Sequence, residues 1–166
     1  PELEAPFVWL DSFTHAPIEQ RTTAYEKACI LYNTAAQITR VSMQLNRSDS
    51  STDALKRAYT GLRQAAGLLQ YIKNNFMYAP SDDMKGPALE SLSKLLLAQA
   101  SEVFLEKSIH DTKGEALIAK LASHTAHTYS GLSVEWNDTD NLRVPAMWCR
   151  IVACKADHFM SVAHLY

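Results

Sequence analysis

The sequence predicts an all-α protein built as an antiparallel stack of helices. Apolar residues recur at spacings of three and four through most of the 166-residue chain, as on the buried face of a helix. Only 5 glycines and 6 prolines are present, too few to punctuate a fold made of many hairpins. Short polar segments join the periodic stretches, which favours neighbouring helices that run in opposite directions.

Five helices are expected, at about residues 21–45, 51–76, 87–109, 112–130 and 145–166, as one segment of a single domain. Residues 1–20 hold no sustained period and predict an extended lead-in, and the polar residues 131–144 predict a loop. The second helix has the clearest pattern, with apolar residues alternating by three and four at Leu55, Ala58, Leu62, Ala65, Leu69, Ile72 and Phe76. The first helix has a wide apolar stripe, which predicts a central position in the stack.

Several residues predict where the helices begin. Ser50 followed by Asp53 fits the capping arrangement in which side chains satisfy free backbone donors of a first turn. Asp111 can cap the fourth helix in the same way. Pro87 and Pro145 suit first turns, where the missing N–H of proline is no loss.

Composition excludes several classes of protein. The formal charge of -2 provides no broad basic field for nucleic acid, and no apolar run is long enough to insert into a membrane. Cys29, Cys149 and Cys154 lie in apolar helical patterns, which favours a reducing, cytoplasmic location. The chain starts at Pro1 and stops at Tyr166 within a running pattern. We expect an excised segment, less stable than its parent domain.

Enzyme chemistry finds little support in the sequence. His124 and His127 are one helical turn apart and could approach one zinc ion, but further ligands are lacking, so two ordinary surface histidines are favoured. Glu102 interrupts an apolar helix centre and could act as a general acid or base, although a bond to a neighbouring helix is favoured. Phosphate-binding loops and nucleophile motifs are missing from the sequence. We expect no catalytic residue, cofactor or metal.

An ordered series of short motifs spans nearly the whole chain. The series comprises VWLDSF (8–13), YEKA (25–28), LYNTAA (31–36), AAG (65–67), YIK (71–73), PSDDM (80–84), LLAQASE (96–102) and EK (106–107), followed by Trp148 and Lys155. It resembles the Bro-one domain family, and the wording is most similar to the rhophilin members. The resemblance implies the central part of a curved, tetratricopeptide-like helical domain.

The resemblance also implies a partner and a site. Family members bind the C-terminal amphipathic helix of an ESCRT-III subunit at endosomes, through positions that match Lys56, Phe104, Lys107, Leu117 and Leu121. A second basic position of the family pocket falls on the uncharged Thr60. The alternative is therefore a structural helical module of a Rho-effector or pH-signalling adaptor, with a lapsed ESCRT-III pocket. Partners of the Rho pathway would act through other domains.

The residue pattern leads to part of the same surface without the family. Leu117 and Leu121 share a helical stripe with His124 and Thr128, so they should be partly exposed. Phe104 shares a half-polar stripe with Ser101 and Ser108, and antiparallel neighbours would bring it close to Leu117. The expected result is an apolar strip rimmed by Lys56 and Lys107, suited to a partner helix.

Overall fold

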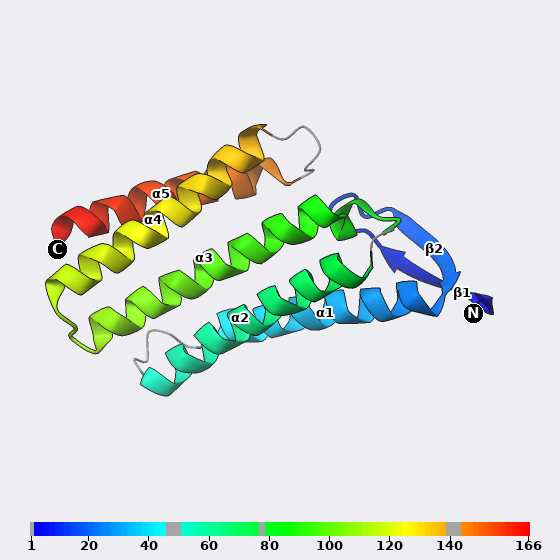
Figure 1. Cartoon of the computed structure of the whole chain (residues 1–166), viewed down its shortest axis with the longest axis horizontal. Coiled ribbons are helices and arrows are strands. Elements are labelled where there is room, and N and C mark those ends of the chain that lie inside the picture. The colour runs from blue at the N-terminus through cyan, green and yellow to red at the C-terminus, as the bar shows by residue number, and fades with distance from the viewer. Residues whose placement is uncertain (1, 46–50, 77–78, 139–143) are drawn as a thin grey trace.

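The computed structural model describes residues 2–45, 51–76, 79–138 and 144–166, with side chains from residue 5 onward. The predicted all-α class is confirmed (Figure 1). The described residues also contain one β-hairpin, which was not predicted. The elements in chain order are β1 (Glu2–Leu10), β2 (Pro17–Thr22), α1 (Thr23–Gln44), α2 (Thr52–Asn75), the short 3-10 helix η1 (Asp82–Met84), α3 (Gly86–His110), α4 (Glu115–Asp138) and α5 (Ala146–Leu165).

The central helix is α3, which lies between the α1–α2 pair and the α4–α5 pair (Figure 1). The prediction that the first helix would be central is wrong, because no described helix or strand covers the outer side of α1, where Ile30 and Val41 are exposed. Helix α3 instead faces two apolar clusters. Leu96 and Val103 pack into the cluster that α3 shares with α1 and α2. Leu105 packs into the cluster that α3 shares with α4 and α5, which we call the α3–α5 cluster.

The fourth helix is longer than predicted. The loop predicted over residues 131–144 is wrong for residues 131–138, which are helical. Helix α4 continues to Asp138 because Leu132 and Trp136 extend the buried stripe of Tyr129 at spacings of three and seven. The indole of Trp136 also donates a hydrogen bond to Ser91 of α3. Residues 139–143 lie outside the described part of the chain.

Two predicted caps differ in the structure. Asp111 ends α3 and does not begin α4, which starts at Glu115 after a turn in which Thr112 has a φ of 50°. Helix α2 is capped by Ser51, whose hydroxyl accepts a hydrogen bond from the Ala54 N–H at 3.0 Å. Ser50, the residue predicted for this role, lies outside the described residues.

In place of the extended lead-in predicted over residues 1–20, residues 2–22 form a β-hairpin. Strands β1 and β2 are antiparallel, with Trp9 opposite Ile18. Between them the Asp11 carboxylate accepts hydrogen bonds from the N–H groups of Phe13 and Thr14, both at 2.8 Å. The Trp9 indole donates to Glu26 at 2.7 Å, which attaches the hairpin to α1.

A carboxylate pair fastens this hairpin to the start of α3. Asp83 of η1 accepts hydrogen bonds from the N–H of Ser12, at 2.8 Å, and from its hydroxyl, while the Asp83 N–H donates to Asp11 at 3.2 Å. Burial acts to raise the pKa of Asp11, but the backbone donors at Thr14, Asp83 and Phe13 outweigh it and hold the pKa below its usual value. These hydrogen bonds hold the hairpin at the end of the helical stack that lies opposite the α3–α4 turn.

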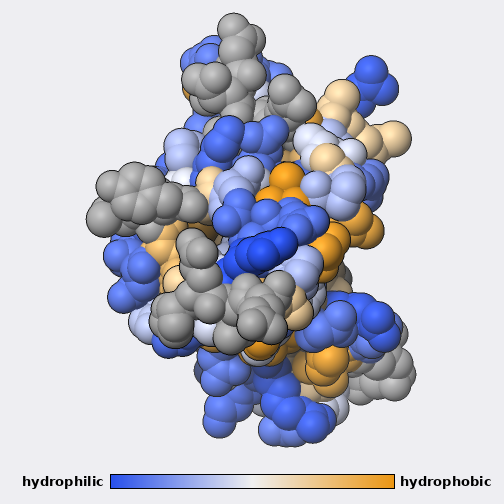
Figure 2. Space-filling view, turned by 90° about the vertical axis from the view of Figure 1, so that its right-hand side faces the viewer, coloured by the Kyte–Doolittle hydropathy of each residue, from blue (hydrophilic) through white to orange (hydrophobic). Residues whose placement is uncertain are grey.

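The end of the molecule that carries the hairpin has a mixed surface. Figure 2 views this end, where hydrophobic residues form separate patches between hydrophilic ones. Val8 and Leu10 are among the exposed apolar side chains of β1. Scattered apolar residues of this kind are common on protein surfaces and do not by themselves mark a binding site.

Gly61 lies where α2 packs tightly against α1. A Cβ added at Gly61 would come within 2.2 Å of the Ser42 hydroxyl, which is buried and donates to the Ile38 carbonyl at 2.8 Å. We expect Gly61→Ala to lower the free energy of unfolding by about 1 to 3 kcal/mol, as overpacking does. Urea unfolding checks this. In a Ser42→Ala background the same substitution should cost much less, and an equal cost in both backgrounds would contradict the contact.

The three cysteines differ in exposure and should differ in reactivity. Cys29 is buried between α1 and η1, and burial raises the pKa of its thiol to about 11, whereas Cys154 is exposed on α5. The thiolate is the reactive species. Iodoacetamide at neutral pH should therefore alkylate Cys154 in the folded protein and leave Cys29 unmodified until urea is added. Peptide mass spectrometry would detect the order, and early labelling of Cys29 would contradict this packing.

Candidate partner-binding surface

The predicted apolar residues are exposed on α3 and α4. Phe104 has 42% of its surface exposed and Leu117 has 47%, while Leu121 is partly buried against the α3–α5 cluster. Leu97, two helical turns before Phe104 on α3, is exposed as well. This agrees with the partial exposure expected from the half-polar stripes.

The expected closeness of Phe104 and Leu117 is wrong, because of the register of α3 against α4. Tyr129 donates to Glu102 at 2.8 Å, and Lys94 binds Glu135 at 2.8 Å, so Phe104 lies level with about residue 127 of α4. With a rise of about 1.5 Å per residue, Leu121 is then about 9 Å and Leu117 about 15 Å further along. The apolar residues form an elongated strip and not one cluster.

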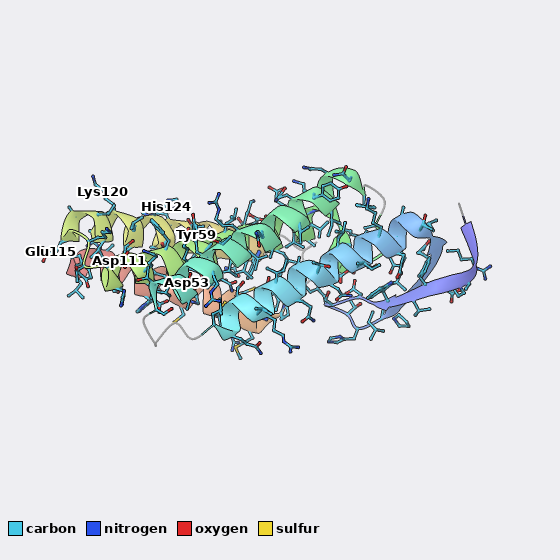
Figure 3. The ribbon with its side chains drawn as sticks, turned by 90° about the horizontal axis from the view of Figure 1, so that it is seen from below. Asp53, Tyr59, Asp111, Glu115, Lys120 and His124 are labelled. Atoms are coloured by element: carbon cyan, nitrogen blue, oxygen red, sulfur yellow. The ribbon has the colours of Figure 1, made fainter. Side chains whose placement is uncertain are left out.

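Figure 3 shows the same order along the molecule. Glu115, Lys120 and His124 of α4 run from the end of the stack toward the level of Tyr59 on α2. We call the surface formed by Lys56, Tyr59, Phe104, Lys107, Leu117 and Leu121 the α2–α4 strip. Its length of several helical turns suits a helix better than a small molecule.

Tyr59 is the member of this strip that sequence reasoning missed. Its ring centroid lies 5.7 Å from that of Phe104, with the planes tilted by 40°, a favourable aromatic contact. Tyr59 thereby fixes the orientation of the exposed Phe104 ring. Its spacing of three from Lys56 on the same helix is the signal that could have identified it.

The two predicted rim lysines are level with each other but differ in their partners. The contacts Thr52–Asp111 and Tyr59–Phe104 set Lys56 of α2 opposite Lys107 of α3. Lys107 binds Asp111, and this hydrogen bond lowers the pKa of the Asp111 carboxyl. Lys56 is exposed and makes no ion pair within the described residues. One of the two expected cations is therefore largely neutralised within the chain.

Thr60 offers no charge at the next turn. Its hydroxyl donates to the Lys56 carbonyl at 2.8 Å, so the side chain bonds within its own helix. One turn earlier on the same helix, Arg57 forms an ion pair with Asp53 at 3.0 Å.

Similarity to known proteins identifies the family of this chain. The sequence profile of the BRO1-like domain matches residues 1–166. This chain belongs to the BRO1-like domain family. It is 38% identical over 164 residues to the vacuolar protein-sorting protein bro1 of Aspergillus fumigatus, covering 99% of this chain and 17% of that protein. It is 33% identical over 167 residues to rhophilin-2 of Homo sapiens, covering 96% of this chain and 24% of that protein.

A solved structure supports the same membership. The ALIX BRO1 CHMP4C complex matches with a TM-score of 0.86 at 26% identity, covering 96% of this chain and 46% of that chain. The chain thus spans under half of the matched structure and about a fifth of these curated relatives. Identity is higher to the fungal sorting protein than to rhophilin-2, although the motif wording favoured rhophilin.

Of the groups singled out for possible chemistry, Glu102 has structural partners in this BRO1-like domain. Glu102 accepts hydrogen bonds from the Tyr129 hydroxyl and, at 2.5 Å, from the Lys155 ammonium of α5, which confirms its predicted bond to neighbouring helices. His124 and His127 are exposed, and the described residues contain no group of three or more potential ligands close enough to hold a metal ion. Among these same residues no helix is long and apolar enough to cross a membrane.

A concave region lies away from the strip. A cavity of about 510 Å³ opens between α1 and α5 across α3, and Trp136 and Trp148 contribute to its apolar lining. It contains none of the residues that define the α2–α4 strip. It therefore provides an independent surface against which binding to the strip can be distinguished.

Proposed function

We propose that this BRO1-like domain is a non-enzymatic protein-binding scaffold of the endosomal sorting machinery, and that it binds the C-terminal amphipathic helix of an ESCRT-III subunit along the α2–α4 strip. The observation that carries the proposal is the exposure of Phe104 and Leu117, at 42% and 47%, on a strip about three helical turns long. Large apolar side chains exposed in a row and bordered by charge fit the apolar face of a helix.

The relatives support this partner class. One relative is named a vacuolar protein-sorting protein, bro1. A matched structure is a complex of ALIX BRO1 with CHMP4C. In our proposal the domain is cytoplasmic and reaches endosomes through its partner, because the ESCRT-III subunit assembles there. Apolar anchors supply the affinity, and the lysines mainly set register and association rate.

A second function has one specific observation in its favour. Thr60 is uncharged and Lys107 is bound to Asp111, so the strip has fewer available cations than the family pattern implies. This supports a structural module of a Rho-effector or pH-signalling adaptor that has lost ESCRT-III binding. The two functions make opposite predictions for direct binding.

Isothermal titration with the C-terminal helix peptide of CHMP4C tests the proposal. We expect saturable one-to-one binding, and no binding of a peptide of the same composition whose apolar residues have been reordered to break the 3-and-4 spacing. Circular dichroism of the protein confirms that it is folded during the titration. Absence of binding by the folded chain at peptide concentrations up to about 1 mM would favour the structural-module alternative, since that limit corresponds to only about 4 kcal/mol.

A further inference from the structure

Arg63 extends the α2 side of the strip by one helical turn. Lys56, Tyr59 and Arg63 are spaced i, i+3 and i+7 and so share one stripe of α2. The Arg63 guanidinium donates to the Tyr59 hydroxyl at 3.1 Å, and its central carbon lies 5.4 Å from the centroid of the Tyr59 ring. Tyr59 thus contacts both the Arg63 guanidinium and the apolar Phe104 ring.

Among the residues that the structure describes, Arg63 forms no ion pair, in contrast to Arg57, Lys73 and Lys107. Arg57 is bound to Asp53, Lys107 to Asp111, and Lys73 to Glu90 at 2.5 Å. Arg63 is exposed, and within the described residues neither Arg63 nor Lys56 forms an ion pair. These two side chains are therefore free to meet carboxylates of a partner.

The contact with Tyr59 also prepares Arg63 for binding. An arginine side chain loses substantial rotamer freedom when it is ordered, and part of that cost falls away when the free protein already holds it. A guanidinium can also bind a carboxylate through two parallel hydrogen bonds, which a lysine cannot. A cation held beside exposed aromatic rings would recognise an acidic residue next to an apolar one.

We infer that Arg63 is a specificity-determining residue of the α2–α4 strip, which recognises a carboxylate of the partner helix beside the apolar residue that packs on Phe104. It supplies, one turn further along α2, the positive charge that Thr60 lacks. The partner helix then carries two acidic residues, one that contacts Lys56 and one that contacts Arg63. They are separated by about 10 Å, because Lys56 and Arg63 are seven residues apart on α2 and a helix rises roughly 1.5 Å per residue. This inference rests on the proposed function of the strip.

The experiment compares Arg63→Gln with Arg57→Gln, a matched control on the same helix whose cation is already bound to Asp53. With the CHMP4C C-terminal peptide, Arg63→Gln should weaken binding about five- to twentyfold at low salt, and Arg57→Gln less than about twofold. Arg63→Lys, which keeps the charge but not the fork of donors, should recover part of the affinity. Peptides in which one acidic residue at a time is changed to its amide identify the carboxylate that Arg63 meets. For that peptide Arg63→Gln should cost no further affinity.

Thermal melts of the variants separate recognition from an internal role. If Arg63 serves only to contact Tyr59 within the protein, Arg63→Gln lowers the melting temperature and leaves the affinity for the peptide unchanged. That result overturns the inference, while the proposed function stands. Equal losses for Arg63→Gln and Arg57→Gln overturn it as well, because they show a general charge effect. Failure of the wild-type chain to bind the peptide overturns the inference together with the proposed function.

Discussion

Replacing Tyr129 by alanine is expected to lower the free energy of unfolding by about 3 to 5 kcal/mol, as truncation of a large buried aromatic side chain does. Tyr129 is fully buried and joins three helices. Its ring stacks on Phe159 of α5 at 5.9 Å, and its hydroxyl donates to Glu102 of α3. The substitution opens a cavity and also leaves Glu102 with fewer donors. Chemical denaturation followed by circular dichroism measures the loss.

Tyr129→Phe is the matched control for this site. It keeps the ring on Phe159 and removes only the hydroxyl, and Lys155 still binds Glu102. The expected loss is about 1.5 to 3 kcal/mol, the usual value for one hydrogen bond to a charged group. Equal losses for the two variants would show that the hydrogen bond, and not the packing, dominates. A loss below about 1 kcal/mol for Tyr129→Ala would contradict the packing between α3, α4 and α5.

Replacing Leu117 by aspartate is expected to weaken binding of the ESCRT-III helix by about 2 to 4 kcal/mol, a typical loss at an interface hot spot. The substitution places a charge against apolar partner atoms, and burial of an unpaired charge is costly. Leu117 is 47% exposed, so the fold should survive. Leu121→Asp should weaken binding to a similar degree. It should also lower stability, because Leu121 packs partly against the α3–α5 cluster.

Val134→Asp is the control for this effect. Val134 lies on the same helix, is 58% exposed, and is 13 residues beyond Leu121, about 20 Å along α4. Fluorescence anisotropy with labelled peptide compares the three variants, and thermal melts confirm that each is folded. Unchanged affinity in folded Leu117→Asp and Leu121→Asp would exclude the strip as the binding surface. An equal loss in Val134→Asp would indicate a nonspecific effect of charge.

The helices could be predicted because their signal is local. Seven apolar residues of α2 between Leu55 and Phe76 keep a spacing of three and four, and such a stripe fits only a helix with one buried face. The last third of α4, residues 131–138, was missed because its polar residues resemble a loop. Leu132 and Trp136 continue the stripe, but their weight becomes clear only when α3 lies against them. The hairpin was missed because neither strand alternates apolar and polar residues in sequence. β1 ends in the continuous apolar run Phe7–Leu10, and β2 alternates in burial but contains only one large apolar residue, Ile18.

The strip was predictable in composition but not in geometry. Exposure of Phe104 and Leu117 follows from the polar residues that share their stripes. Their separation follows from the register of α3 against α4, which side chains such as Glu102 and Tyr129 set after folding. The Lys107–Asp111 pair has an i, i+4 spacing and could have been anticipated, whereas the contact of Tyr59 with Phe104 requires the packing of α2 on α3.

Mapping of the bound peptide by NMR tests the binding surface most directly. Amide and methyl chemical shifts of the isotope-labelled chain would be followed during titration with the CHMP4C C-terminal peptide. Our account predicts the largest changes at Tyr59, Phe104, Leu117 and Leu121, with the residues lining the α1–α5 cavity, such as Trp148, nearly unchanged. Largest changes in that cavity, or no changes at saturating peptide, would contradict binding of an ESCRT-III helix on the α2–α4 strip.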